Sequence, residues 1–81
     1  MAAKVGLLHL DVVVNDAFTL KDKRRVIKSF KDRIRARHNV SIAEVDALDS
    51  RRRAVLTVAM VANDSRYVEG ALQQVLNAAN V

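Results

Sequence analysis

One strongly basic stretch constrains the fold of this chain more than any other feature. Residues 19–37, TLKDKRRVIKSFKDRIRAR, contain nine Lys or Arg and two Asp, so they carry a net charge of +7. The whole chain carries +5, which leaves −2 for all other residues (5 − 7). The apolar residues of the stretch recur with helical spacing: Leu20, Val26, Ile27, Phe30 and Ile34. This pattern predicts an amphipathic helix with an apolar stripe toward a core and a basic surface toward solvent.

The first turn of this helix has a recognisable start signal. Thr19 is the expected N-cap, and Asp22, three residues later, completes a capping box. A turn at residues 15–17 precedes it. The polar side of the helix is expected to expose Lys21, Arg24, Arg25, Lys28, Asp32 and Arg35, with Lys23 and Lys31 flanking the apolar stripe.

Length and composition describe one small domain spanning residues 1–81. The absence of Cys excludes a disulfide scaffold, a thiolate nucleophile and a Cys-ligated metal site. No apolar run reaches the roughly 18 residues of a membrane span, and the N-terminus does not resemble a signal peptide. We therefore expect a cytoplasmic protein, and the pI near 10.3 favours anionic partners.

Three further segments have the alternating or continuous apolar pattern that is typical of strands. They are residues 4–14, 40–47 and 52–62, and a second helix is expected at residues 66–79. The third strand is apolar on both faces, as a central strand would be. The short connection before it predicts a hairpin with the second strand.

The order β-α-β-β-α predicts an α+β, ferredoxin-like sandwich with both helices on one face of the sheet. That fold normally has a fourth strand beside the first, and here the final strand is expected to be missing or very short. In the sheet order 1-3-2 the first strand is an apolar edge, which favours pairing with another chain. We expect a homo-oligomer formed through this edge.

Several blocks resemble the YlxP-like family, small bacterial proteins of unknown function. LKDKR at residues 20–24 resembles the family's S-L-K-E-K-R, with Thr19 in place of the usual Ser, and NVSIAEVD at residues 39–46 resembles N-V-S-V-A-E-V-D. RAVL with VA, within residues 53–59, and VAND at residues 61–64 resemble R-A-V-L-G-V-A and V-S-N-D. The resemblance implies a ferredoxin-like fold in the bacterial cytoplasm. The family's genes commonly lie among those for transcription antitermination, translation initiation and ribosome maturation, which implies a role near RNA or the ribosome.

Charge and resemblance together predict a non-catalytic protein that binds RNA or a ribosomal particle without a cofactor. No expected strand carries an aromatic residue for base stacking, so recognition of the RNA backbone or shape is favoured. The expected binding residues are Lys21, Lys23, Arg24, Arg25, Lys28, Arg35, Arg51, Arg52 and Arg53. The alternative is an oligomeric structural or regulatory module that holds a small anionic ligand at a subunit interface. A helix lying on a membrane surface is a third interpretation of residues 19–37.

Few residues offer acid–base or metal chemistry. His9 and Asp11 share one face of the first strand, while Glu44 and Asp46 lie on the second strand. The third strand is expected to separate the two pairs, and Glu44 is expected to pair with an Arg. We therefore expect neither a catalytic nor a metal site.

Overall fold

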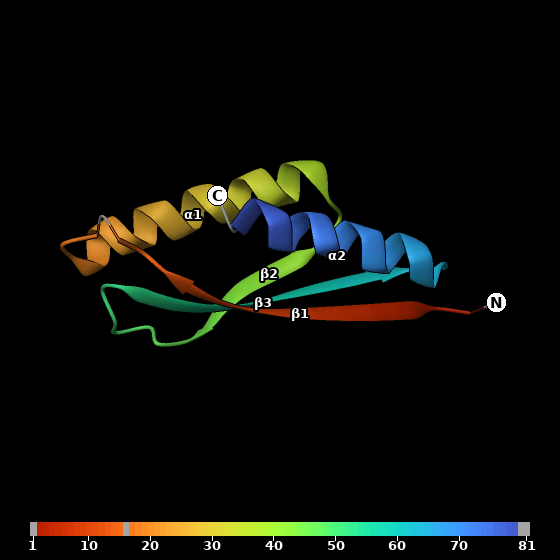
Figure 1. Ribbon diagram of the computed structural model, residues 1–81, viewed down its shortest axis with the longest axis horizontal. Helices are drawn as coiled ribbons and strands as arrows, with labels where there is room; N and C mark the ends of the chain where they lie inside the picture. Colours follow the sequence, from red (N-terminus) through yellow and green to blue (C-terminus); the bar gives the residue numbers. More distant parts are fainter. Residues whose placement is uncertain (1, 16, 80–81) are drawn as a thin grey trace.

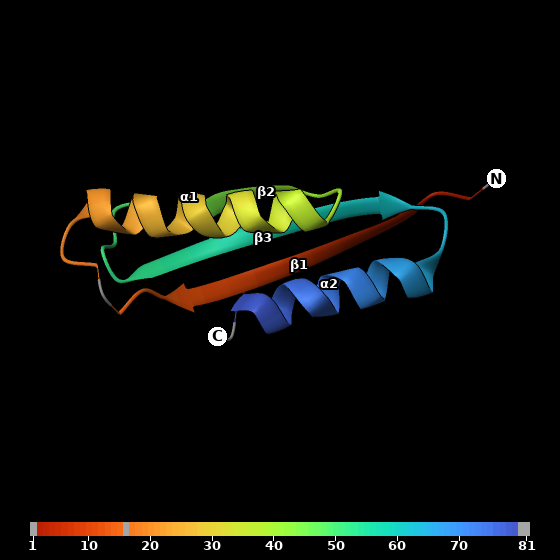
Figure 2. The ribbon, with the colours of Figure 1, turned by 90° about the horizontal axis from the view of Figure 1, so that it is seen from above.

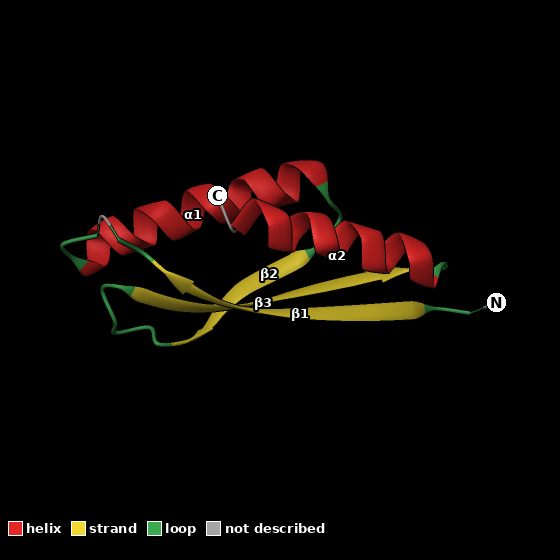
Figure 3. Cartoon of the chain, viewed as in Figure 1, coloured by secondary structure: helices red, strands yellow, loops and turns green. Residues whose placement is uncertain are grey.

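The computed structural model describes residues 2–15 and 17–79. Its elements follow the predicted order (Figures 1 and 3): β1 (Lys4–Val13), α1 (Leu20–Arg37), β2 (Ser41–Asp46), β3 (Arg53–Ala62) and α2 (Ser65–Ala79). Each boundary lies within one residue of its prediction. Asp16 of the predicted turn, and Asn80 and Val81 after α2, lie outside the described residues.

The three strands form one antiparallel sheet in the order β1-β3-β2. Leu10 pairs with Leu56 on one side of β3, and Ile42 pairs with Val58 on the other. Both the central position of β3 and the β2–β3 hairpin were predicted. The architecture is α+β and consistent with a ferredoxin-like arrangement, and residues 2–15 and 17–79 contain no fourth strand.

The molecule has two layers, because both helices cover the same face of the sheet (Figure 1). The predicted inner face of β1 does meet the helices, with Leu10 and Val14 buried. Alternate residues of β3 complete the floor of the core, and Leu56 and Val58 have no solvent exposure. The opposite face of the sheet has no covering element among the described residues (Figure 1).

Helix α1 begins with the predicted capping box. Thr19 Oγ1 accepts a hydrogen bond from the Asp22 backbone nitrogen at 3.1 Å, and Asp22 Oδ2 accepts one from the Thr19 nitrogen at 3.2 Å. The seam that faces the sheet has heptad spacing and consists of Leu20, Lys23, Ile27, Phe30 and Ile34. Val26 was predicted to widen the apolar stripe. It is instead 47% exposed, because it lies to one side of the buried seam.

Helix α2 contacts β1 and, when the molecule is viewed from above, runs alongside it outside its free edge (Figure 2). The two elements approach closely at Gly6. A Cβ there would overlap Val68 Cγ1 and would lie 2.7 Å from Leu72 Cδ1. Glycine at this position therefore sets how closely α2 packs on the sheet.

The outer edges of the sheet differ. At the β2 edge, Arg35 Nη2 donates to the Ile42 carbonyl at 2.9 Å, so a side chain of α1 occupies part of the free backbone. A bulge between Glu44 and Asp46 further interrupts that edge. The β1 edge is ten residues long and has neither a side chain bonded to its free backbone nor a bulge.

Candidate functional site

A stripe of basic residues runs along one flank of α1. We call Lys21, Arg24, Lys28, Lys31 and Arg35 the basic stripe. Each follows a residue of the buried seam by one position, which places it about 100° around the helix. Arg35 reaches the β2 edge, so the basic stripe lies on the β2 side of α1. Lys31 was not among the predicted binding residues, although its spacing places it there.

Acidic residues neutralise only the C-terminal part of the basic stripe. Lys28 Nζ lies 2.8 Å from Asp32 Oδ2, and Arg35 Nη1 lies 4.0 Å from Asp32 Oδ1. Lys28 provides the main hydrogen bond that lowers the pKa of Asp32. In the first two turns, Lys21, Arg24 and the adjacent Arg25 are exposed and form no ion pair within residues 2–15 and 17–79. Arg33 and Arg37, nearer the end of the helix, also form no ion pair among the described residues, so uncompensated positive charge extends along α1 and includes its first two turns.

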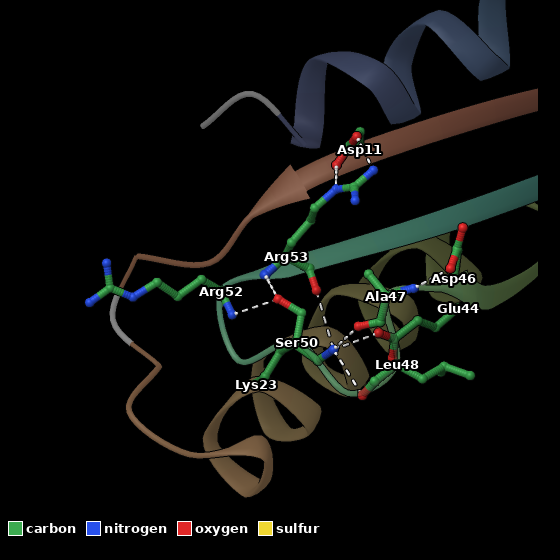
Figure 4. A network of polar contacts seen from close by, with 9 residues as sticks. All are labelled: Asp11, Lys23, Glu44, Asp46, Ala47, Leu48, Ser50, Arg52 and Arg53. Carbon is green, nitrogen blue, oxygen red and sulfur yellow. Dashed lines mark hydrogen bonds and ion pairs between the residues drawn. The ribbon is translucent and has the colours of Figure 1, made fainter.

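Lys23 is not part of this surface, which corrects the prediction that it binds there. Its side chain is 0% exposed, and its Nζ lies 2.8 Å from Glu44 Oε2 (Figure 4). It also donates to the carbonyl oxygens of Ala47 (2.9 Å), Arg53 (3.2 Å) and Leu48 (3.4 Å). The expected pairing of Glu44 with an Arg is likewise wrong, because Lys23 fills that role. Lys23 occupies a seam position, three residues after Leu20 and four before Ile27, and that spacing was the signal for its burial.

The buried amine holds the loop that joins β2 to β3. Ala47 has a φ of 56°, a left-handed conformation that disfavours residues with a Cβ. Ser50 Oγ accepts hydrogen bonds from the backbone nitrogens of Arg52 and Arg53 at 3.3 and 3.1 Å. Together with the contacts of Lys23, these bonds fix the path of residues 47–53.

The loop places two of the predicted arginines at the same end of the molecule as the start of α1 (Figure 1). Arg51 Nη1 donates to the Phe18 carbonyl at 3.0 Å, immediately before the α1 cap. The Arg52 side chain points away from the Lys23 network (Figure 4). Arg51 and Arg52 therefore add positive charge at the end of the molecule where α1 begins.

Arg53 lies on the other side of the sheet. Its Nε and Nη2 donate to Asp11 Oδ1 and Oδ2, both at 2.9 Å, on the face that the helices do not cover. These hydrogen bonds lower the pKa of Asp11 and raise that of Arg53. Lys21, Arg24, Arg25, Lys28, Arg35, Arg51 and Arg52 thus remain on the helix side or at its end, whereas Arg53 is separate and neutralised.

The candidates for acid–base or metal chemistry, His9, Asp11 and Glu44, are divided between the two faces of the sheet. His9 Nδ1 lies 2.9 Å from Thr57 Oγ1 on the uncovered face. Glu44 points to the opposite face, under α1, so the sheet as well as the central strand separates it from His9 and Asp11. No group of three or more His, Asp or Glu residues suited to a metal ion occurs among the described residues.

Within residues 2–15 and 17–79, neither helix is long and apolar enough to cross a membrane. Residues 5–80 match the family described as "Protein of unknown function (DUF503)". A Bacillus subtilis (strain 168) protein, "Uncharacterized protein YlxP", is 33% identical over 72 residues, which are 89% of this chain and 78% of that relative. The heptad seam, the capping box and the basic first turns thus occur in a chain that belongs to the YlxP-like, DUF503 family of proteins of unknown function.

Proposed function

We propose that this protein is a cytoplasmic, non-catalytic RNA-binding protein that contacts the phosphate backbone, in a role linked to the ribosome or its maturation. The observation that carries the proposal is the set of exposed, unpaired cations in the first two turns of α1: Lys21, Arg24 and Arg25. Arg51 and Arg52 of the β2–β3 loop lie at the same end of the molecule and would add to its attraction for phosphates.

The charge on this helix exceeds what its own stability requires. Residues 20–37 carry +7, and removing buried Lys23, which Glu44 neutralises, leaves +6 on the exposed part. Lys21 lies in the first turn, where the helix dipole disfavours a cation. A phosphate group would relieve this repulsion, since it accepts hydrogen bonds from Lys and Arg and gains from the dipole.

Backbone contact is favoured over the reading of bases. The basic surface is the flank of a helix. Its long, flexible Lys and Arg side chains can reach phosphate groups. The three strands carry no Phe, Tyr or Trp on which bases could stack. Discrimination among RNA sequences should therefore be weak, and affinity should depend strongly on salt.

The test is the binding of a fluorescein-labelled RNA hairpin, followed by fluorescence anisotropy across a KCl series. Four or five phosphate contacts should give a slope of log K against log [salt] of about −3 to −4. The variant R24E/R25E should lose about two units of that slope. Binding at low salt that survives K21E/R24E/R25E/K28E would show the proposal to be wrong.

A charge-matched control separates local contacts from net charge. K4E/R66E changes two cations at the starts of β1 and α2, at the other end of the molecule from the start of α1 (Figure 1). Both double variants lower the net charge from +5 to +1 (5 − 4). Equal losses of binding in the two would mean that no local site exists. Co-sedimentation of wild type and R24E/R25E with ribosomal particles then tests the proposed target class.

A further inference from the structure

The uncovered face of the sheet is apolar mainly where β1 begins and β3 ends. Four aliphatic side chains on it are unusually open for their type: Val5 (70% exposed), Leu7 (61%), Val13 (68%) and Val61 (58%). They lie on β1 and β3, with half-buried Val55 and Ala59 between them. A soluble domain gains nothing from holding such residues in water, so we infer that this face is covered in the working protein.

The charge of the face indicates what kind of partner covers it. Although the chain carries +5, the charged residues on this face are Asp11, Arg53 and Asp46, gathered at one end. Asp11 and Arg53 form a bidentate pair, and Asp46 adds to the raised pKa of Arg53. The face is therefore not basic, which suits an apolar protein surface and not a nucleic acid.

The size of the face is sufficient for a stable contact. Ten-residue strands at about 3.4 Å per residue and three strands about 4.8 Å apart give a flat footprint of roughly 400 Å² once the shorter β2 is counted. Protruding side chains make the accessible area larger than the footprint. A specific interface should bury about 1,000 Å² in total, or about 500 Å² on each partner.

The shape of the uncovered face is complementary to the same face of a second copy. Two rows cross all three strands: Leu7, Ala59 and Ser41 form one, and His9, Thr57 and Ala43 form the other. In both rows the large residue is on β1 and the small residue is on β2. A two-fold rotation about an axis along β3 places the β1 of one copy over the β2 of the other. The large residues on β1 of each copy then meet the small residues on β2 of the other copy.

We propose that two copies of this chain pack their uncovered sheet faces together as an aligned sandwich, with β1 of each copy over β2 of its partner. Aligned sheets of this kind pack about 10 Å apart with interdigitated side chains. The rotation keeps the strand direction, so the apolar ends with Val5 and Val61 coincide. The Asp11–Arg53 pairs come together at the other end, where water reaches them. The basic stripes of the two copies then lie on the outer layers.

Pairing through the β1 edge is the competing geometry. It would leave Val61 in solvent, because β3 is one strand away from that edge. It would also bring two copies of α2 over one pair of strands, since α2 already extends beyond β1 (Figure 2). Strands lie about 4.8 Å apart, whereas packed helices need 8–10 Å between their axes. Val61 is therefore buried in the face-to-face dimer and exposed in the edge-paired dimer.

Sedimentation velocity over a concentration series into the high micromolar range tests the proposal. Wild type should sediment as a dimer. V61K should raise the dimer dissociation constant by about 100-fold or more, because each copy would bury an unpaired charge. A43L should raise the dimer dissociation constant by about 10- to 100-fold, because the larger side chain on β2 would clash with β1 of the other copy. Both positions lie on the uncovered face, so circular dichroism should show a folded monomer.

V26K is the matched control, because Val26 is an exposed valine on α1, away from the uncovered face. It should leave the dimer intact. A monomeric wild type would overturn the proposal. A dimer that persists in both V61K and A43L would also overturn it and would assign the contact to the edge. Dissociation by V26K to the same extent as V61K would show a general charge effect and would equally overturn it.

Discussion

Lys23 Nζ and Glu44 Oε2 lie 2.8 Å apart beneath α1, and the lysine side chain has no contact with solvent. The ammonium group donates to three backbone carbonyls in addition to the carboxylate. A buried charge is tolerated only when it is paired and hydrogen-bonded, and this arrangement meets both conditions. The pair joins α1, β2 and the following loop at one point.

Replacement of Lys23 by Met should lower the free energy of unfolding by about 3–5 kcal/mol, because Glu44 would lose its partner in a nearly buried place. Urea denaturation followed by circular dichroism measures this loss. Lys31→Met, on the half-exposed flank of the same helix, should change it by about 0.5 kcal/mol or less. Glu44→Gln should cost less than Lys23→Met, since the amide oxygen still accepts a hydrogen bond. Equal stability of Lys23→Met and wild type would contradict the anchoring role.

Acid should weaken the Asp11–Arg53 pair. Its hydrogen bonds hold the pKa of Asp11 below the usual value, which is about 3.9 in an unfolded chain. A carboxyl whose folded pKa is depressed stabilises the protein above its unfolded pKa, and this contribution disappears as the pH falls through the folded pKa. Asp11→Asn should therefore flatten the fall in stability below about pH 4. Thermal denaturation of both proteins down the acid range checks this, and parallel curves would contradict it.

The two glycines should respond oppositely to Ala. Gly6→Ala forces a Cβ against Val68 and Leu72, so it should cost about 1–3 kcal/mol by overpacking. Gly70, within α2, has no atom within 4 Å of a built Cβ, so Gly70→Ala should stabilise the helix by about 1 kcal/mol. Differential scanning calorimetry should show a lower Tm for the first variant and a Tm about 4–8 °C higher for the second. A stabilising Gly6→Ala would mean that α2 packs less closely.

Relief of the backbone conformation at Ala47 should stabilise the loop. Its φ of 56° costs an L-residue about 1–2 kcal/mol, whereas Gly adopts it freely. After the greater entropy of Gly in the unfolded chain is counted, Ala47→Gly should still gain a few tenths to about 1 kcal/mol. The same change at Ala36, exposed in α1, should lose about 1 kcal/mol. Chemical denaturation of the two variants gives the comparison, and losses in both would place Ala47 in an unstrained conformation.

Much of the fold followed from the sequence by itself. Alternation and helical spacing located every strand and helix within one residue, because these periods come from backbone geometry. Thr19 and Asp22 fixed the start of α1 through a contact only three residues long. The accumulation of positive charge on residues 19–37 also follows from composition alone.

Only the tertiary structure decided which charges face solvent. Lys23 and Arg24 are neighbours in sequence and equal in charge, yet one is buried beside Glu44 and the other is exposed. That difference depends on a carboxylate 21 residues away and on the carbonyls of a loop that no local pattern specifies. Arg53 likewise follows Arg52 in sequence but joins Asp11 across the sheet, 42 residues away. Local periods fix where side chains point along an element, whereas long-range packing determines which partners they meet.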